Sequence, residues 1–323
     1  MTDFRKILNI SLFIFSAIFN LLAIYIVSTV PKDKVYKDFA KLLKFQFVFD
    51  LCYSLYFLIT GFQLYLTEDG LICNLRNFNL DNMFRIIYIF LIAIHVIFIY
   101  FNVFYITVML FLSYFQSYNQ LKIKIEHFVS GVIFVFAISA YLAFVNLVTI
   151  DINSSLSVIF RNSTSSSENI VGMKIPLYGF KFTFSLGNIF FLLTANYISS
   201  IVILIKYIYH ITINTNNISA SVKKTAYELC SILFAQSMVP FIIFGMPVII
   251  YLIRTEYQID TQELGNLFIT CHGLNPTNNA LLFLLLSTRN RSVIFEVIKK
   301  ILSKNNVGDY QMNNHIVVFH THH

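Results

Sequence analysis

Long runs of apolar residues alternate along the chain with short polar segments. Six runs contain no charged residue, and a seventh contains only Asp50. Each covers at least 23 residues, which is enough for a helix to cross the ~30 Å hydrocarbon core of a bilayer. The pattern therefore predicts an all-α membrane protein, a bundle of seven transmembrane helices within residues 1–288. The predicted spans are Ile7–Val30, Phe45–Thr67, Ile86–Phe115, Phe128–Ile150, Phe182–Ile205, Leu229–Ile253 and Leu264–Thr288.

The sixth run is broken by Pro240, Gly245 and Pro247. Proline removes a backbone donor, and a membrane helix tolerates this where neighbouring helices bond the freed carbonyl groups. We therefore expect a kinked span whose two halves can pivot.

After the seventh run, residues 289–302 predict an amphipathic helix on the membrane surface. Its charged side chains lie away from an apolar helical stripe. Residues 303–323 are then a short polar tail on the cytoplasmic side. The stripe consists of Val293, Ile294, Val297, Ile298 and Ile301.

The composition excludes an ordinary soluble domain, because 57% of the residues are apolar and only 12% are charged. We expect no enzyme, since the chain has no HExxH, no GxSxG and no glycine-rich phosphate loop. No metal or cofactor site is predicted either. The four cysteines show no zinc-site spacing and no dense disulfide pattern.

Basic residues predict the orientation in the lipid bilayer. With the N-terminus outside, the inner segments hold 15 lysines and arginines and the outer segments hold eight. The positive-inside rule therefore favours an outer N-terminus and an inner C-terminus. The net charge of +7 is then mainly a cytoplasmic face, and we find no basic and aromatic platform for nucleic acid.

Three polar side chains within the spans are candidates for function. Asp50 is the only acid in a span, and a charge near the middle of a bilayer costs at least ~2.5 kcal/mol. Asn20 and Asn275 lie midway along the first and seventh spans, so we expect their amides to solvate Asp50 if these helices are neighbours. The three groups either fix helix packing or form a polar switch or cation site.

Other polar residues in the spans are candidates for a ligand pocket. A lone histidine in a membrane helix usually makes an interhelical hydrogen bond, and the alternative is a ligand or proton role. The candidates are His95, Tyr100, Gln236 and His272, with Asn102 a further polar residue of the third span.

Short motifs carry a resemblance to a known family. Asn20 and Asp50, with their separation of 30 residues, are similar to the first-helix Asn and second-helix Asp of class A G-protein-coupled receptors. Asn275-Pro276-x-x-Asn279 resembles the NPxxY motif of the seventh helix in that class, with Asn in place of Tyr. The sixth span, FAQSMVP, resembles FxxCWxP, with Met in place of Trp.

Departures from class A point to a divergent branch. The third span ends in LFLSYFQSYNQ without a DRY motif, so the usual ionic latch is missing. The loop at 151–181 has no cysteine, so Cys73 cannot form the usual disulfide with it. Pro240, Pro247 and Pro276, followed by Arg289 at the membrane exit, are similar to nematode serpentine chemoreceptors.

What the resemblance implies is a chemosensory receptor in the plasma membrane, on sensory cilia. A small-molecule ligand would bind between the outer halves of the helices, and a heterotrimeric G protein would bind inside. The alternative is a transporter or a ligand-gated channel for a small molecule or ion. The implied polar switch is Asn20, Asp50, Asn275 and Pro276, and the implied hinge is Phe234, Gln236, Met238, Pro240 and Pro247.

We predict N-glycosylation at Asn153 and Asn162, because both sequons lie in the long loop expected outside the membrane. Replacing both residues by Gln should abolish any glycosidase-sensitive shift in apparent mass on a gel. The sequons at Asn217 and Asn290 fall on the inner side, and replacement of Asn217 is the control. A mass shift that survives the double replacement would contradict the predicted orientation of this loop.

Overall fold

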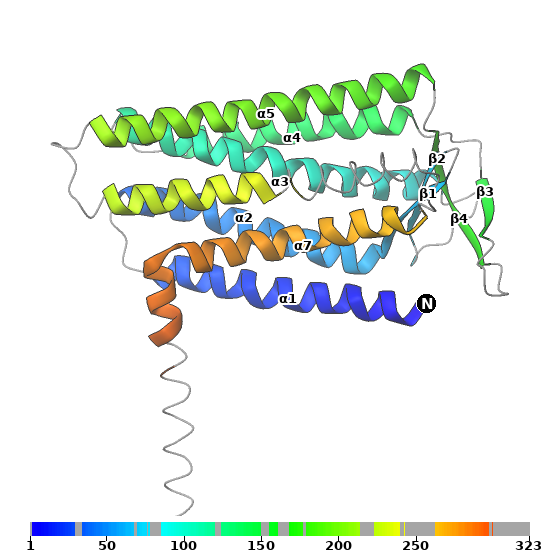
Figure 1. The fold of residues 1–323 in the computed structure, drawn as a ribbon, viewed down its shortest axis with the longest axis horizontal. Coiled ribbons are helices and arrows are strands. Elements are labelled where there is room, and N and C mark those ends of the chain that lie inside the picture. The colour runs from blue at the N-terminus through cyan, green and yellow to red at the C-terminus, as the bar shows by residue number, and fades with distance from the viewer. Residues whose placement is uncertain are drawn as a thin grey trace, which may run out of the picture.

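The computed structural model is a bundle of long helices that run side by side, with a small sheet at one end (Figure 1). It describes residues 2–29, 34–67, 70–75, 77, 85–119, 124–149, 155–160, 168–176, 179–213, 223–239, 242, 262–296 and 299. Two helical segments cover residues 223–239 and 288–296. The other helices are α1 (Thr2–Thr29), α2 (Lys34–Thr60), α3 (Arg85–Asn119), α4 (Ile125–Val148), α5 (Phe180–Ile213) and α7 (Gln262–Leu286).

Five of these helices are long and apolar enough to cross a membrane, and they correspond to the first five predicted spans. Helix α7 has 25 residues, but the polar residues in its middle lower its hydropathy. Of the sixth predicted span, the structure describes only residues 229–239 and residue 242. The five stretches are Lys6–Thr29, Phe39–Thr60, Ile86–Gln116, Ile125–Val148 and Phe180–Ile213.

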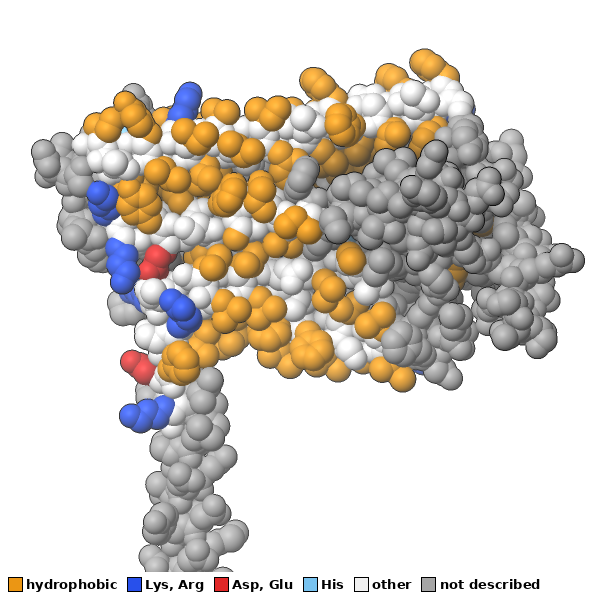
Figure 2. Space-filling view, viewed as in Figure 1, with side chains coloured by type: hydrophobic (Ala, Val, Ile, Leu, Met, Phe, Trp, Pro, Cys, Tyr) orange, Lys and Arg blue, Asp and Glu red, His pale blue; other side chains and the backbone are white. Residues whose placement is uncertain are grey.

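The outside of the bundle is largely apolar. Phe190 and Phe191 on α5 are 72% and 68% exposed, and Phe144 on α4 is 64% exposed. In Figure 2, apolar side chains cover the length of the visible helices, and the lysines and arginines gather toward the end that carries helix 288–296. Such a surface would be unfavourable in water, and it fits a membrane-embedded protein.

A four-stranded antiparallel sheet was not predicted from the sequence. Its strands are β1 (Phe62–Thr67), β2 (Gly70–Leu75), β3 (Ser155–Phe160) and β4 (Glu168–Pro176), in the spatial order β1-β2-β4-β3. The all-α prediction therefore describes the bundle and misses the sheet. Because β2 pairs with β4, the α2–α3 connection and the α4–α5 connection are joined by backbone hydrogen bonds.

The predicted second span, Phe45–Thr67, is wrong at both ends. Helix α2 begins at Lys34 and ends at Thr60, where Gly61 adopts a φ of 57° and donates its N–H to the Phe57 carbonyl at 3.0 Å. Glycine tolerates this left-handed conformation and often ends a helix. The remaining apolar residues form β1, and an apolar run alone does not separate a buried helix from a buried strand. As a consequence, Asp50 lies near the middle of the apolar stretch Phe39–Thr60.

The β1–β2 hairpin packs onto the ends of the helices through an apolar cluster. The Tyr88 hydroxyl on α3 accepts the Leu75 N–H at 2.7 Å and lies 3.3 Å from the Cys73 carbonyl oxygen. Burial raises the pKa of the Cys73 thiol to about 12. The cluster joins Phe62, Leu64, Cys73 and Leu75 of the hairpin to Leu12, Phe57, Tyr88, Ile92 and Ile269 of the helices.

We predict that Tyr88→Phe loosens this hairpin. The change leaves the buried Leu75 N–H without its acceptor, which costs about 1–3 kcal/mol. The measurement is the rate of maleimide labelling of Cys73 at pH 8, in a variant that lacks the other three cysteines. The rate should rise several-fold, since the thiol becomes reactive only when the hairpin opens. Tyr141→Phe, which loses a hydroxyl on the exposed face of α4, is the control, and equal labelling rates in the two variants would contradict the prediction.

Candidate functional site

Asp50 lies at the centre of a buried network of amide side chains. Its carboxylate accepts one hydrogen bond from Asn102 Nδ2 at 2.5 Å and another from Asn279 Nδ2 at 3.2 Å. Asn279 Nδ2 also donates to Asn102 Oδ1 at 3.0 Å, which closes the group into a triangle. Asp50 and Asn279 are fully buried, and Asn102 is 3% exposed. The network therefore ties α2, α3 and α7 together at one point.

Close helix packing brings these three residues together. Helix α2 packs against α1, α3 and α7. Gly273 permits the approach of α7, because a Cβ at this position would lie 3.2 Å from the Phe57 ring and 3.3 Å from Leu12. Small residues at such contacts let membrane helices come near each other. Asn279 lies on the same helix, and it meets Asp50 across this contact.

Gln236 connects a fourth helix to the network. It lies in helix 223–239, is fully buried, and donates its Nε2–H to the Asn279 backbone carbonyl at 2.8 Å. Asn279 therefore contacts α2 and α3 with its side chain and helix 223–239 with its backbone. A displacement of α7 relative to helix 223–239 must break or rearrange this bond.

Asn20 belongs to an adjoining set of bonds. Its Nδ2 donates to the Ser16 carbonyl at 2.9 Å and to the Pro276 carbonyl at 3.3 Å. Ser16 in turn shares a 2.6 Å hydrogen bond with Ser54 of α2. This set holds α1 against α2 and α7 beside Pro276, which lies inside α7.

The predicted partners of Asp50 were wrong. Asn20 and Asn275 were expected to solvate the carboxylate, but its hydrogen-bond donors are the amides of Asn102 and Asn279. Asn20 is bound to Ser16 and Pro276 instead, and Asn275 is 5% exposed. Both true partners were visible in the sequence, Asn279 in the seventh-helix motif and Asn102 as a polar residue of the third span.

Some amide oxygens of the network and of the adjoining set are left without partners. Among the described residues, five buried amide oxygens have no hydrogen-bond partner, although buried polar atoms nearly always have one, and one of the five is Gln46 Oε1. Asn279 carries one of these oxygens and also binds the Asp50 carboxylate, and such a combination of oxygen atoms suits a water molecule or a hard cation. A proton on Asp50 would be the other way to balance its charge. The other four oxygens are Asn20 Oδ1, Asn275 Oδ1, Asn279 Oδ1 and Gln236 Oε1.

His95 lies in an aromatic cluster beneath the sheet. The imidazole is fully buried and stacks on Phe62 of β1 at 4.0 Å between ring centroids. Tyr53 and Phe57 of α2 also lie against it, at 5.6 and 6.0 Å. Neither ring nitrogen of His95 has a hydrogen-bond partner among the described residues. The interhelical hydrogen bond that a lone histidine usually makes is therefore not seen among these residues.

The four predicted pocket residues do not form one site. His272 of α7 is buried and lies near enough to His95 for an electrostatic interaction. Tyr100 instead faces α4, where Asn146 Nδ2 lies 3.5 Å from its hydroxyl, and Gln236 belongs to the Asp50 network. Tyr100 and Gln236 thus have other partners than the two histidines.

The remaining predicted residues are described only in part. Phe234 and Met238 are half-buried in helix 223–239, one turn apart on the same helix as Gln236. Pro240 and Pro247 lie outside the described residues, as do Asn153 and Asn162.

Comparison with known proteins does not assign this chain to a family, because no protein-family model and no curated protein matches it.

We predict that Asp50→Leu destabilises the folded protein and that Asp50→Asn does not. Leucine leaves the Asn102 and Asn279 amides without an acceptor, at a cost of about 1–3 kcal/mol for each buried group. Asparagine keeps one acceptor, and the free Oδ1 of Asn279 can accept from the new amide. The apparent melting temperature in detergent should therefore fall for Asp50→Leu alone.

Cys52→Leu is the matched control, since it changes an exposed residue of the same helix. Equal melting temperatures for Asp50→Leu and Cys52→Leu would show that the network does not stabilise the bundle.

Proposed function

We propose that the protein is a seven-transmembrane receptor that binds a small molecule on the outside and activates a heterotrimeric G protein inside. The observation that carries the proposal is the Asp50 network, which couples α2, α3, α7 and helix 223–239 through buried hydrogen bonds. A buried acid inside an apolar bundle is a functional feature by default, because hydrophobic side chains would be cheaper there. We place the receptor in the plasma membrane, as a chemosensory protein of a sensory cilium.

Seven spans fit the arrangement of the helices. Helix 223–239 and α7 pack with the five long helices, and their sequence runs supply the sixth and seventh spans. The start of α1 lies at the same end as the sheet, and helix 288–296 lies at the other end (Figure 1). With the basic residues inside, the sheet and the N-terminus are extracellular.

The receptor would work by a change in helix packing. A ligand shifts the equilibrium only if it binds one packing better than the other. A ligand at the outer ends would act on α3 and α7, which carry the buried side chains of His95 and His272. Asn279 then passes the change to helix 223–239 through Gln236, and movement of the inner end of that helix opens a cleft for the G protein.

Epitope tags at both ends test the seven-span arrangement. The N-terminal tag should be stained on intact cells, and the C-terminal tag only after permeabilisation. An inner N-terminus would favour the channel alternative, and staining of the C-terminal tag on intact cells would contradict the receptor.

A screen of small molecules against a panel of G proteins tests the activity itself. Asp50→Asn should reach the cell surface and alter G-protein output, with a loss of any difference between sodium and sodium-free buffer, since the amide carries no charge. Wild-type output at wild-type surface level in both buffers would leave Asp50 a packing residue.

A further inference from the structure

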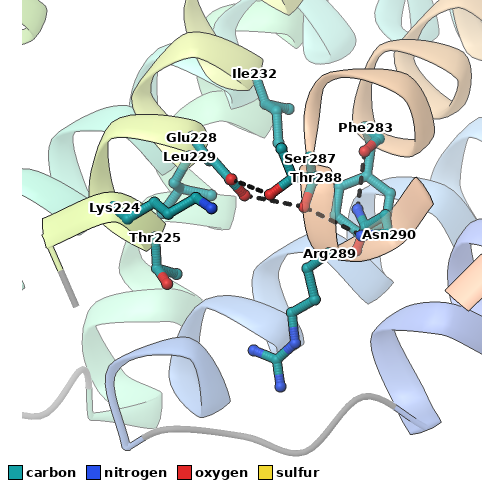
Figure 3. A pocket seen from close by; sticks show the side chains of 10 residues that line it. All are labelled: Lys224, Thr225, Glu228, Leu229, Ile232, Phe283, Ser287, Thr288, Arg289 and Asn290. Carbon is teal, nitrogen blue, oxygen red and sulfur yellow. Dashed lines mark hydrogen bonds between the residues drawn. The ribbon is translucent and has the colours of Figure 1, made fainter. Parts of the chain in front are cut away.

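A small cavity separates the inner end of helix 223–239 from the junction where α7 ends and helix 288–296 begins (Figure 3). Its volume is about 300 Å³. Leu229, Ile232 and Phe283 form its apolar wall, and Glu228 faces the junction from helix 223–239. The cavity therefore combines an apolar wall with one carboxylate and the basic side chains of Lys224 and Arg289.

Glu228 bridges the two sides of this cavity. Thr288 Oγ1 donates to one carboxylate oxygen at 2.5 Å, and Ser287 Oγ donates to the other at 3.2 Å. Both oxygens of the carboxylate are thus held by hydroxyl groups of the junction, as the dashed lines in Figure 3 show. Hydrogen bonds to a charged group are stronger than those between neutral groups.

The junction keeps its shape without Glu228. Ser287 Oγ also accepts the Asn290 N–H at 3.3 Å, and Asn290 Nδ2 donates to the Phe283 carbonyl at 2.8 Å. These bonds close the turn between α7 and helix 288–296 internally. Opening of the Glu228 contact therefore needs movement of helix 223–239 alone.

Two other contacts define how that helix can move. Gln236 holds it to α7 at the level of the Asp50 network, and the Tyr227 hydroxyl shares a 2.8 Å hydrogen bond with Thr212 of α5. Glu228 lies eight residues before Gln236, which corresponds to ~12 Å along a helix. A pivot at Gln236 thus separates Glu228 from α7 while Tyr227 can stay with α5.

We propose that Glu228 is a latch that holds the inner end of helix 223–239 against α7 in the resting packing. The contact is half-exposed, and water can replace the hydroxyl groups when it opens, so the latch is weak and reversible. The existence of the latch can be tested by distance measurements alone. It rests on the proposed function only when G-protein signalling is measured.

The direct test is a distance measurement on the purified protein in lipid nanodiscs. Nitroxide labels at Lys223→Cys and Ser28→Cys report the separation of helix 223–239 from α1, which packs beside α7. The native exposed cysteine, Cys52, is replaced in this background. Glu228→Gln and Thr288→Val should each raise the population of the longer distance roughly three- to tenfold.

Two matched variants act as controls. Thr288→Ser keeps the hydroxyl, and Glu296→Gln removes an exposed acid of the next helix, so neither should change the distances. Unchanged distances in both Glu228→Gln and Thr288→Val would overturn the latch. If the Glu228→Gln variant aggregates, the distances of the Thr288→Val variant alone decide whether the latch exists. Thr288 is suited to this because its side chain is exposed.

Basal output across a panel of G proteins separates the latch from the proposed function. A rise in output that follows the longer distance supports both. A longer distance without output from any G protein supports the latch and contradicts the receptor.

Discussion

The structure depends on the need to satisfy a carboxylate that is fully buried inside an apolar bundle. A membrane helix can bury Asp50 only if neighbouring side chains approach its oxygens, and here Asn102 and Asn279 do so. These bonds fix the rotation of α2, α3 and α7 relative to one another. Gln236 is buried as well, and it donates to the backbone carbonyl of Asn279 in the same region. Apolar side chains in place of this network would pack equally well. The helices would then be freer to slide past one another.

The polar contacts lie at three levels along the bundle. The sheet and the His95 cluster close one end, the Asp50 network crosses the middle, and Glu228 bridges the other end. Asn279 is central because its side chain and its backbone serve different helices. A helix displacement at one end can therefore reach the other end through α7 and helix 223–239, with few residues in between.

The sequence was sufficient to predict most of the helices, because long charge-free runs have one good solution in a membrane. It was not sufficient where an apolar run continued past the end of a helix. Nothing in the run Phe62–Thr67 distinguishes a buried strand from a helix until Gly61 is seen to adopt a positive φ. The same limit applied to the polar core, where Asp50 was found but its partners were not. Which amide meets a carboxylate depends on helix rotation, and rotation follows from packing rather than from spacing along one chain.

The sheet also has a consequence for how the protein is made. Cys73 in β2 pairs with Met173 in β4, so the strands that meet are 100 residues apart in the chain. A ribosome reaches β4 only after α3 and α4 have been synthesised, and a contact of such long range forms late. The β1–β2 hairpin must therefore wait beside a partly inserted bundle with one strand edge still open. Completion of the sheet is then a late step of assembly, and a defect in β4 would leave the edge of β2 unpaired after the helices have formed.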